Sequence, residues 1–246
     1  MLAINISSDV LEGYGRMNND YLPQIKKLEE YNRTLLERIN SRNDKAALSA
    51  QNIDAAAGKL MDTLEELKED IARKADKEKY EAGKLKAKDD LNAVPEVFLS
   101  VTGGKGKALR LSLDTFKEDA LSLIKNDAHR QLVGTYLNTE SPGTGISWEK
   151  ETFSYLPAIG GVPFINKMQE EVLMCVNEVY RSLLYEEAED GKGGAFVFIN
   201  EDQMIVNKDG TVDLPVVQIT PALTSILYTD YENPLNILTA GIPFNE

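Results

Sequence analysis

Hydrophobic residues recur every three or four positions along four stretches of the chain, a spacing that places side chains on one face of an α-helix. The longest stretch lies between Gly160 and Gly191, with Pro163 near its start and no Gly or Pro between Pro163 and Gly191. Proline in the first turn and glycine past the last turn are typical helix boundaries. Two adjoining rows make more than half of the circumference apolar: Ile165, Met168, Val172, Cys175, Val179 and Leu183, and Leu173, Val176, Tyr180 and Leu184. We expect this stretch to be the central helix of an elongated bundle, covered by several others.

The other three stretches predict helices over residues 9–40, 52–79 and 107–128. Asp9 and Glu12 have capping-box spacing at the start of the first helix, and Pro23 is expected to kink it. In the second helix the apolar residues alternate every four and three positions, which suits packing on a neighbour at a shallow angle. Its other face is charged, and the charge run continues to Asp90. Such a run is typical of a solvated face, and a binding surface is the alternative.

The connector from Leu91 through Pro95 ends in a cluster rich in Gly and Lys: Gly103, Gly104, Lys105, Gly106 and Lys107. A loop of this composition before a helix suggests a phosphate site, because backbone N–H groups and a lysine cradle anions. The spacing argues against it. Val101 and Ala108 stand where a P-loop needs Gly and Ser or Thr, and Leu109 stands where the dinucleotide fingerprint needs its third Gly. The cluster therefore predicts a structural turn.

Aromatic residues gather just before the central helix. Ser147 can cap a short helical segment that carries two acidic residues near its positive end. The segment leads into Pro157 and contains four large apolar residues: Trp148, Phe153, Tyr155 and Leu156. We expect these side chains to cover one end of the bundle, and a ligand cage is the alternative.

Composition and charge restrict the chemistry. The net charge is −13 and the isoelectric point is about 4.7, so nucleic acid and an anionic membrane surface would be repelled. His129 is the single histidine and Cys175 the single cysteine, which leaves too few groups for a zinc site or a Ser-His-Asp triad. His129 is expected at a helix end or on the surface, and Cys175 in the apolar core. We predict no catalytic residues, no cofactor and no metal, hence a protein that is not an enzyme.

After Gly191 the pattern changes to runs of β-branched and aromatic residues. Strands are predicted at residues 195–199, 204–206, 211–219, 224–229 and 235–239, with a hairpin turn at residues 207–210. The predicted organisation is a helical bundle over residues 1–190, a β-hairpin junction over 191–223, and strands over 224–246 that are either the first strands of a truncated domain or strands completed by another copy of the chain. The fold class is mainly α, followed by a short β segment.

The first six residues are apolar but too few to span a bilayer, and they lack the features of a signal peptide. They are either an ordinary first turn packed on the bundle or the end of a transmembrane helix. Composition alone favours the first interpretation.

Several motifs in order resemble one family. They are the Gly103–Arg110 segment, Trp148-Glu149-Lys150 with Phe153 and Pro157, and Lys167-Met168-Gln169 with the three residues that follow it. Together they resemble the periplasmic part of the gliding-motility proteins GldM and PorM. Leu227-Tyr228 and Asn233-Pro234-Leu235 are similar to the opening of that family's second, immunoglobulin-like domain. The resemblance reverses the preference at the N-terminus, since residues 1–8 resemble the end of the family's membrane helix.

The resemblance implies a homodimeric, periplasmic component of the type IX secretion and gliding machinery, anchored in the inner membrane. Its partners in that family are a proton-driven motor protein, GldL or PorL, and ring proteins of the GldK and GldN or PorK and PorN type. No nucleic acid is expected, and membrane contact is expected only through the N-terminal helix that this sequence lacks. The role implied is the transmission of force from the motor to an outer-membrane-associated ring. The alternative is a periplasmic helical sensor or ligand-binding domain.

Overall fold

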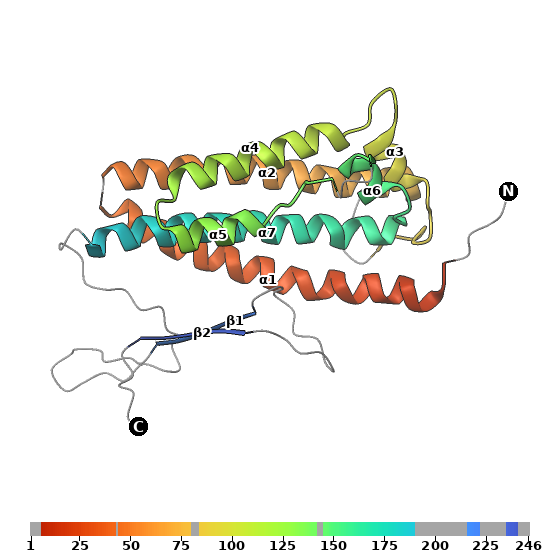
Figure 1. The fold of residues 1–246 in the computed structure, drawn as a ribbon. Helices are drawn as coiled ribbons and strands as arrows, with labels where there is room; N and C mark the ends of the chain where they lie inside the picture. The colour runs from red at the N-terminus through yellow and green to blue at the C-terminus, as the bar shows by residue number, and fades with distance from the viewer. Residues whose placement is uncertain are drawn as a thin grey trace. The chain divides into compact units, whose positions relative to one another are not determined.

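The structure, a computed structural model, describes residues 6–42, 44–79, 84–141, 145–189, 216–221 and 235–240. These residues form seven helices and two strands (Figure 1): α1 (Ser8–Asn40), α2 (Lys45–Asp76), α3 (Ala93–Leu99), α4 (Gly106–Leu123), α5 (Asp127–Thr135), α6 (Trp148–Phe153), α7 (Ala158–Glu189), β1 (Val216–Pro221) and β2 (Leu235–Ala240). The chain divides into two compact units, Met1–Glu187 and Ala188–Glu246. The mainly helical class is confirmed.

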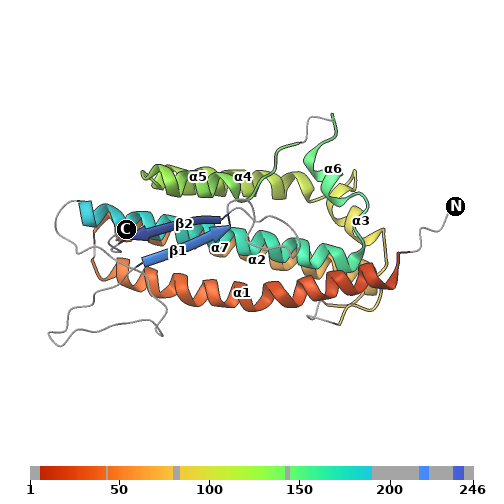
Figure 2. The ribbon, with the colours of Figure 1, turned by 60° about the horizontal axis from the view of Figure 1, so that its bottom comes forward.

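The first unit is built on three long helices, α1, α2 and α7, of 33, 32 and 32 residues. At about 1.5 Å per residue each is close to 50 Å long. Figures 1 and 2 show α1, α2, α4 and α7 extending side by side, with α3 and α6 at the end where α1 begins. Helices α1 and α7 run parallel, because Asn18 bonds to Asn166 near their starts and Arg42 bonds to the Leu183 carbonyl near their ends. Helix α2 returns between these ends and is antiparallel to both.

Helix α7 is the central helix, as the apolar rows predict. Among residues 158–184 only Lys167 is exposed. The helix begins earlier than Gly160, because the backbone N–H groups of Ala158 and Ile159 donate to the carbonyls of Asp90 and Lys88 at 2.8 and 3.1 Å. Pro163 therefore lies inside the helix and not in its first turn.

The ends of α1 and α2 differ from the sequence expectation. Ser7, and not Asp9, caps α1, since its hydroxyl accepts from the Val10 N–H. Helix α1 continues through Pro23 as one element. Helix α2 begins seven residues before Asn52, because Asp44 caps it by accepting from a backbone N–H at 3.0 Å. The first turns of α2 bury alanines, whose small side chains contribute little to a count of apolar spacing.

The region between α2 and α7 differs from the sequence prediction more than the ends of α1 and α2 do. Helix α3 occupies part of the predicted connector, and Pro95 is tolerated at its third position, within the first turn, where the N–H has no helical partner. The predicted helix over residues 107–128 is two helices. Helix α4 ends because Ile124 is extended, with φ −98° and ψ 121°, and Asn126 then caps α5 by accepting from the N–H groups of Ala128 and His129.

In the second unit, β1 and β2 pair antiparallel, with Val216 opposite Ala240 and Pro221 opposite Leu235. They overlap the runs predicted at residues 211–219 and 235–239. The sequence pattern pairs residues 235–239 with 224–229, whereas the described partner of β2 is β1. An apolar run does not by itself select its neighbour in a sheet.

Several sequence predictions fall outside the described residues. These are the strands at residues 195–199, 204–206 and 224–229, the turn at 207–210, and residues 1–5. The immunoglobulin-like domain therefore stays a prediction. In the described part of the chain, no helix combines the length and apolar character needed to cross a membrane.

Candidate functional site

Four aromatic side chains join three helices at the end of the bundle where α1 begins. The rings of Phe98 on α3 and Phe153 on α6 stack with centroids 3.8 Å apart and planes 7° apart. Trp148 and Phe164 meet the Phe153 ring edge-on, with centroids at 5.5 and 5.7 Å. We call these four residues the aromatic corner. It fixes α3 and α6 against the start of α7.

The short helix α6 forms as the sequence predicts. The Ser147 hydroxyl accepts from the Lys150 N–H, and Glu149 and Glu151 lie in the first turn, where the helix dipole favours acidic groups. Phe153 is fully buried, whereas Tyr155 is 84% exposed. The expectation that Tyr155 covers the end of the bundle is wrong, because α6 ends at Phe153 and the chain turns there towards α7.

The glycine cluster is a tight turn between α3 and α4. A Cβ atom on Gly104 would lie 2.7 Å from the Phe98 carbonyl, and one on Gly106 would lie 2.8 Å from the same oxygen. Neither position accepts a larger residue without a backbone shift. The Lys105 ammonium lies 2.5 Å from Asp70 on α2, so the lysine fastens the turn to the bundle.

The family-motif residues named from the sequence fall into three places. At the turn lie Gly103, Gly104, Lys105, Gly106 and Lys107. A Cβ atom on Gly103 would meet nothing within 4 Å, and Lys107 is exposed. At the corner lie Trp148, Phe153 and the buried Pro157. Along α7 lie Lys167 and Gln169, which face different neighbours. The fold therefore brings the motifs to one end of the bundle, but not to one site.

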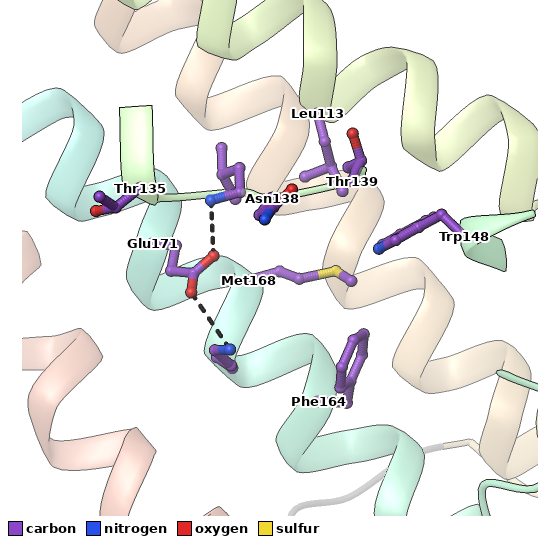
Figure 3. A pocket seen from close by; sticks show the side chains of 10 residues that line it. Leu113, Thr135, Asn138, Thr139, Trp148, Phe164, Met168 and Glu171 are labelled. Atoms are coloured by element: carbon purple, nitrogen blue, oxygen red, sulfur yellow. Dashed lines mark hydrogen bonds and ion pairs between the residues drawn. The ribbon is translucent and has the colours of Figure 1, made fainter. Parts of the chain in front are cut away.

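A cleft of about 110 Å³ opens beside α7 (Figure 3). Its walls come from α4, from the chain between the last residue of α5 and the first residue of α6, and from α7. The lining residues are Leu113, Thr135, Leu137, Asn138, Thr139, Trp148, Phe164, Lys167, Met168 and Glu171. In Figure 3, Trp148, Phe164 and Met168 border one part of the cleft, and the polar side chains lie towards the α5–α6 segment.

The polar wall of the cleft is organised by Glu171. Its carboxylate accepts the Leu137 N–H at 2.8 Å and lies 3.6 Å from the Lys167 ammonium, as Figure 3 shows. Leu137 has a φ of 48°, in the left-handed region that leucine rarely adopts, and its side chain is buried. The core contact of Leu137 and the bond to Glu171 hold this conformation. Thr139 donates to Asp114 and ties the same segment to α4.

The chemistry available in the cleft is limited. Metabolite-sized ligands occupy pockets of roughly 300–1,000 Å³, and this cleft holds about 110 Å³. Burial raises the pKa of the nearby Cys175 thiol, so the thiolate that would act as a nucleophile is disfavoured. Within the described residues, no group of three His, Cys, Asp or Glu side chains could hold a metal ion.

A buried lysine forms the most extensive polar contact of α7. Lys68 on α2 is 3% exposed, and its ammonium donates to Glu65 at 2.5 Å and to Asn166 and Gln169 at 3.0 Å. The Gln169 amide donates in turn to Glu65, and the Asn166 amide donates to Asn18 on α1, both at 2.8 Å. The three long helices thus meet at one hydrogen-bonded cluster. We call these five residues the Lys68 cluster.

Further polar contacts follow along α7. Asn177 donates to Asn32 on α1, and Asn32 donates to the Leu173 carbonyl, both at 2.8 Å. The Tyr180 hydroxyl donates to Asp54 on α2 at 2.9 Å. Sequence reasoning missed all these contacts. The available signal was Asn32, which interrupts the apolar row of α1.

His129 lies near the start of α5, at a helix end as expected. Its ring contacts Glu178 on α7, which also lies 3.2 Å from Arg181. The ring is largely buried, so the surface alternative is wrong. The contact attaches the short helix α5 to the central helix.

Together, these features define an α-helical bundle around a buried central helix, with a small cleft and extensive buried polar contacts. The class is that of a helical-bundle domain. A family model described as the GldM N-terminal domain matches residues 9–186, and the chain belongs to this family. Membership makes it a component of the gliding-motility and type IX secretion machinery. A comparison with curated proteins finds no match.

Proposed function

We propose that this domain is a non-enzymatic, periplasmic structural element that transmits force in a type IX secretion and gliding machine. It links a proton-driven inner-membrane motor of the GldL or PorL type to an outer-membrane-associated ring of the GldK and GldN or PorK and PorN type. In this proposal the full-length protein is a homodimer anchored in the inner membrane. Membership in the GldM family supports a place in this machine, and the burial of α7 supports a mechanical role.

The observation that carries the mechanical role is the burial of α7. Over residues 158–184 most of the helix is buried: Lys167 is its one exposed residue, and Phe164, Glu171, Met174 and Arg181 on the same face are partly exposed. A helix enclosed at the density of a protein interior cannot bend without displacing its neighbours. Displacement of one end is therefore passed to the other end, about 50 Å away.

The cleft beside α7 does not itself favour a sensor. A sensor changes shape when it binds a ligand, and its two states must differ in their contacts with that ligand. The cleft beside α7 is below the size that metabolite sites have. The walls of the cleft are also held together by the contacts of Glu171 and Thr139.

The two roles differ in whether the bundle must rearrange, and a covalent crosslink separates them. Asn32 and Asn177 touch across α1 and α7, so Asn32→Cys with Asn177→Cys, in a Cys175→Ala background, is the pair to test for a disulfide in the oxidising periplasm. The variant is placed in the full-length protein, and secretion and gliding are measured with and without reductant. Each single cysteine variant is the matched control.

A rigid element keeps its activity when crosslinked. We therefore expect secretion equal to that of the single variants once the disulfide is confirmed by mobility in non-reducing electrophoresis. Loss of secretion that reductant restores would show that α1 and α7 must move apart, and the rigid-element proposal would then be wrong.

A further inference from the structure

The repeating apolar stripe of α2, taken by itself, leaves the position of α7 along the bundle axis undetermined. The buried apolar stripe of α2 repeats every seven residues: Ile53, Ala57, Leu60, Leu64, Leu67 and Ile71. A stripe with this repeat meets a similar partner surface after a slide of seven residues, about 10 Å. The stripe therefore permits more than one alignment of α7, and the close approach of Gly161 to Ile71 and Val94 is one contact that selects among them.

The polar contacts between α2 and α7 permit one alignment. Three pairs contribute: Asn166 with Lys68, Gln169 with Glu65, and Tyr180 with Asp54. Along α7, Gln169 and Tyr180 follow Asn166 by 3 and 14 residues. Along α2, Glu65 and Asp54 precede Lys68 by the same 3 and 14 residues. All three pairs thus belong to a single antiparallel register, although they are spread over about 20 Å.

A slide of seven residues would place Leu173 or Ile159 opposite Lys68. The ammonium would keep Glu65, which lies on the same helix, but would lose its hydrogen bonds to Asn166 and Gln169 while it remained in the core, where the loss of hydrogen bonds to a charged group is costly. Asn18 on α1 adds a constraint from the third helix, because its side chain accepts from Asn166.

We propose that the Lys68 cluster is a register lock that holds α7 at one axial position between α1 and α2. The lock goes beyond the proposed function and does not depend on it. The test of the lock measures a distance inside the domain and not secretion. The register-lock proposal can therefore be disproved while force transmission is kept, and force transmission can be disproved while the register lock is kept.

The lock is removed by replacing the buried cluster with apolar residues. The variant is Asn18→Leu, Lys68→Met, Asn166→Leu and Gln169→Met together; Glu65 is kept, because its side chain is 57% exposed and can turn to water. Replacing all buried partners at once leaves no polar group stranded, a change that is often close to neutral for stability.

Spin labels on exposed positions report the register. Leu48→Cys on α2 and Lys167→Cys on α7, in a Cys175→Ala background of the whole chain, place the labels roughly 30 Å apart along the axis. A slide of seven residues changes this separation by about 10 Å. Pulsed electron paramagnetic resonance measures the distance distribution.

We expect one narrow distance with the Lys68 cluster intact, and a second distance displaced by up to about 10 Å in the apolar variant. The matched control makes two similar changes at exposed positions, Asn19→Leu and Lys59→Met, and should keep one distance. A single unchanged distance in the apolar variant would overturn the proposal. Failure of that variant to fold would also overturn it, since the proposal holds that the apolar stripes suffice to assemble the bundle.

Discussion

The long helices and the short elements of this bundle are specified in different ways. Helices α1, α2 and α7 follow a repeated apolar pattern, and every turn of the pattern supports the same assignment. The elements from α3 to α6 depend on single contacts: the ring stack of Phe98 on Phe153, the close approach at Gly104, and the left-handed Leu137 held by Glu171. A repeated pattern tolerates the loss of one member, whereas a single contact does not.

The polar contacts of the two regions also differ. In the long-helix core they cross between helices and are buried, as in the Lys68 cluster and the Asn32–Asn177 pair. In the short elements many are local caps, such as Ser147 and Asn126, that end or begin a helix. Buried contacts between helices fix how the elements align, and local caps fix where each element starts.

The largest effect is expected at the aromatic corner. Phe153→Ala removes a fully buried ring that contacts three other aromatic residues, which should lower the free energy of unfolding by about 3–5 kcal/mol. Chemical denaturation measures this change in the free energy of unfolding. Tyr155→Ala, two residues on and largely exposed, is the control and should change stability by less than about 0.5 kcal/mol. Equal effects of the two variants would show that the stack does not hold the short elements.

A proline in the long-helix core should have the next largest effect. Lys59→Pro lies in the middle of α2 on its exposed face, so it removes a helical hydrogen bond and should cost about 3 kcal/mol without changing the core. Lys45→Pro replaces the same residue type at the first position of α2, where proline is well tolerated. Thermal unfolding of both variants checks the difference. If Lys45→Pro were as damaging as Lys59→Pro, the start of α2 would be placed wrongly.

The contact between the two regions is tested by a pair of glycines. A Cβ atom on Gly161 of α7 would lie 2.8 Å from Ile71 of α2 and 2.8 Å from Val94 of α3. Gly161→Ala should therefore destabilise the fold by about 1–3 kcal/mol. Gly58→Ala, inside α2 with nothing within 4 Å, should instead stabilise it by roughly 0.5–1 kcal/mol. Opposite signs in denaturant titrations support the close approach, and a stabilising Gly161→Ala would argue against it.

The smallest effect is a change in pH dependence at Glu170. Burial raises the pKa of this carboxyl on α7, and the neighbouring Glu171 raises it further. The folded state then holds the proton more tightly than the unfolded state. The stability that Glu170 contributes through this proton is complete below the ordinary pKa range of glutamate. It is lost as the pH rises through the pKa of Glu170 in the folded state.

Glu170→Gln removes the cost of burying the charged form. We expect it to stabilise the fold at pH 7 and to give no gain near pH 4, as measured by denaturant unfolding at the two pH values. Glu66→Gln, on the exposed face of α2, is the matched control and should show no such difference. A gain for Glu170→Gln that is the same at both pH values would exclude charge burial as its cause.

The sequence predicted most of the long-helix core and part of the candidate site. Apolar spacing gave α7 as the central helix, and Ser147 gave the start of α6. Helix α3 was missed, because seven residues are too few for a helical period to stand out from a connector. The cleft was also missed, since its walls come from segments distant in sequence; Trp148, Lys167 and Met168 of its lining had been named, but as parts of motifs and of an apolar row.

By itself, the sequence determined the fold class, the central helix, the turn at Gly104 and Gly106, and the family to which the chain belongs. Each of these depends on residues close together in the chain or on a motif read in order. The tertiary structure alone decided that Lys68 lies in the core and that Asn166 and Gln169 are its partners. A lysine within a charged run looks solvated from its neighbours in sequence. Its burial depends on a helix that follows about a hundred residues later.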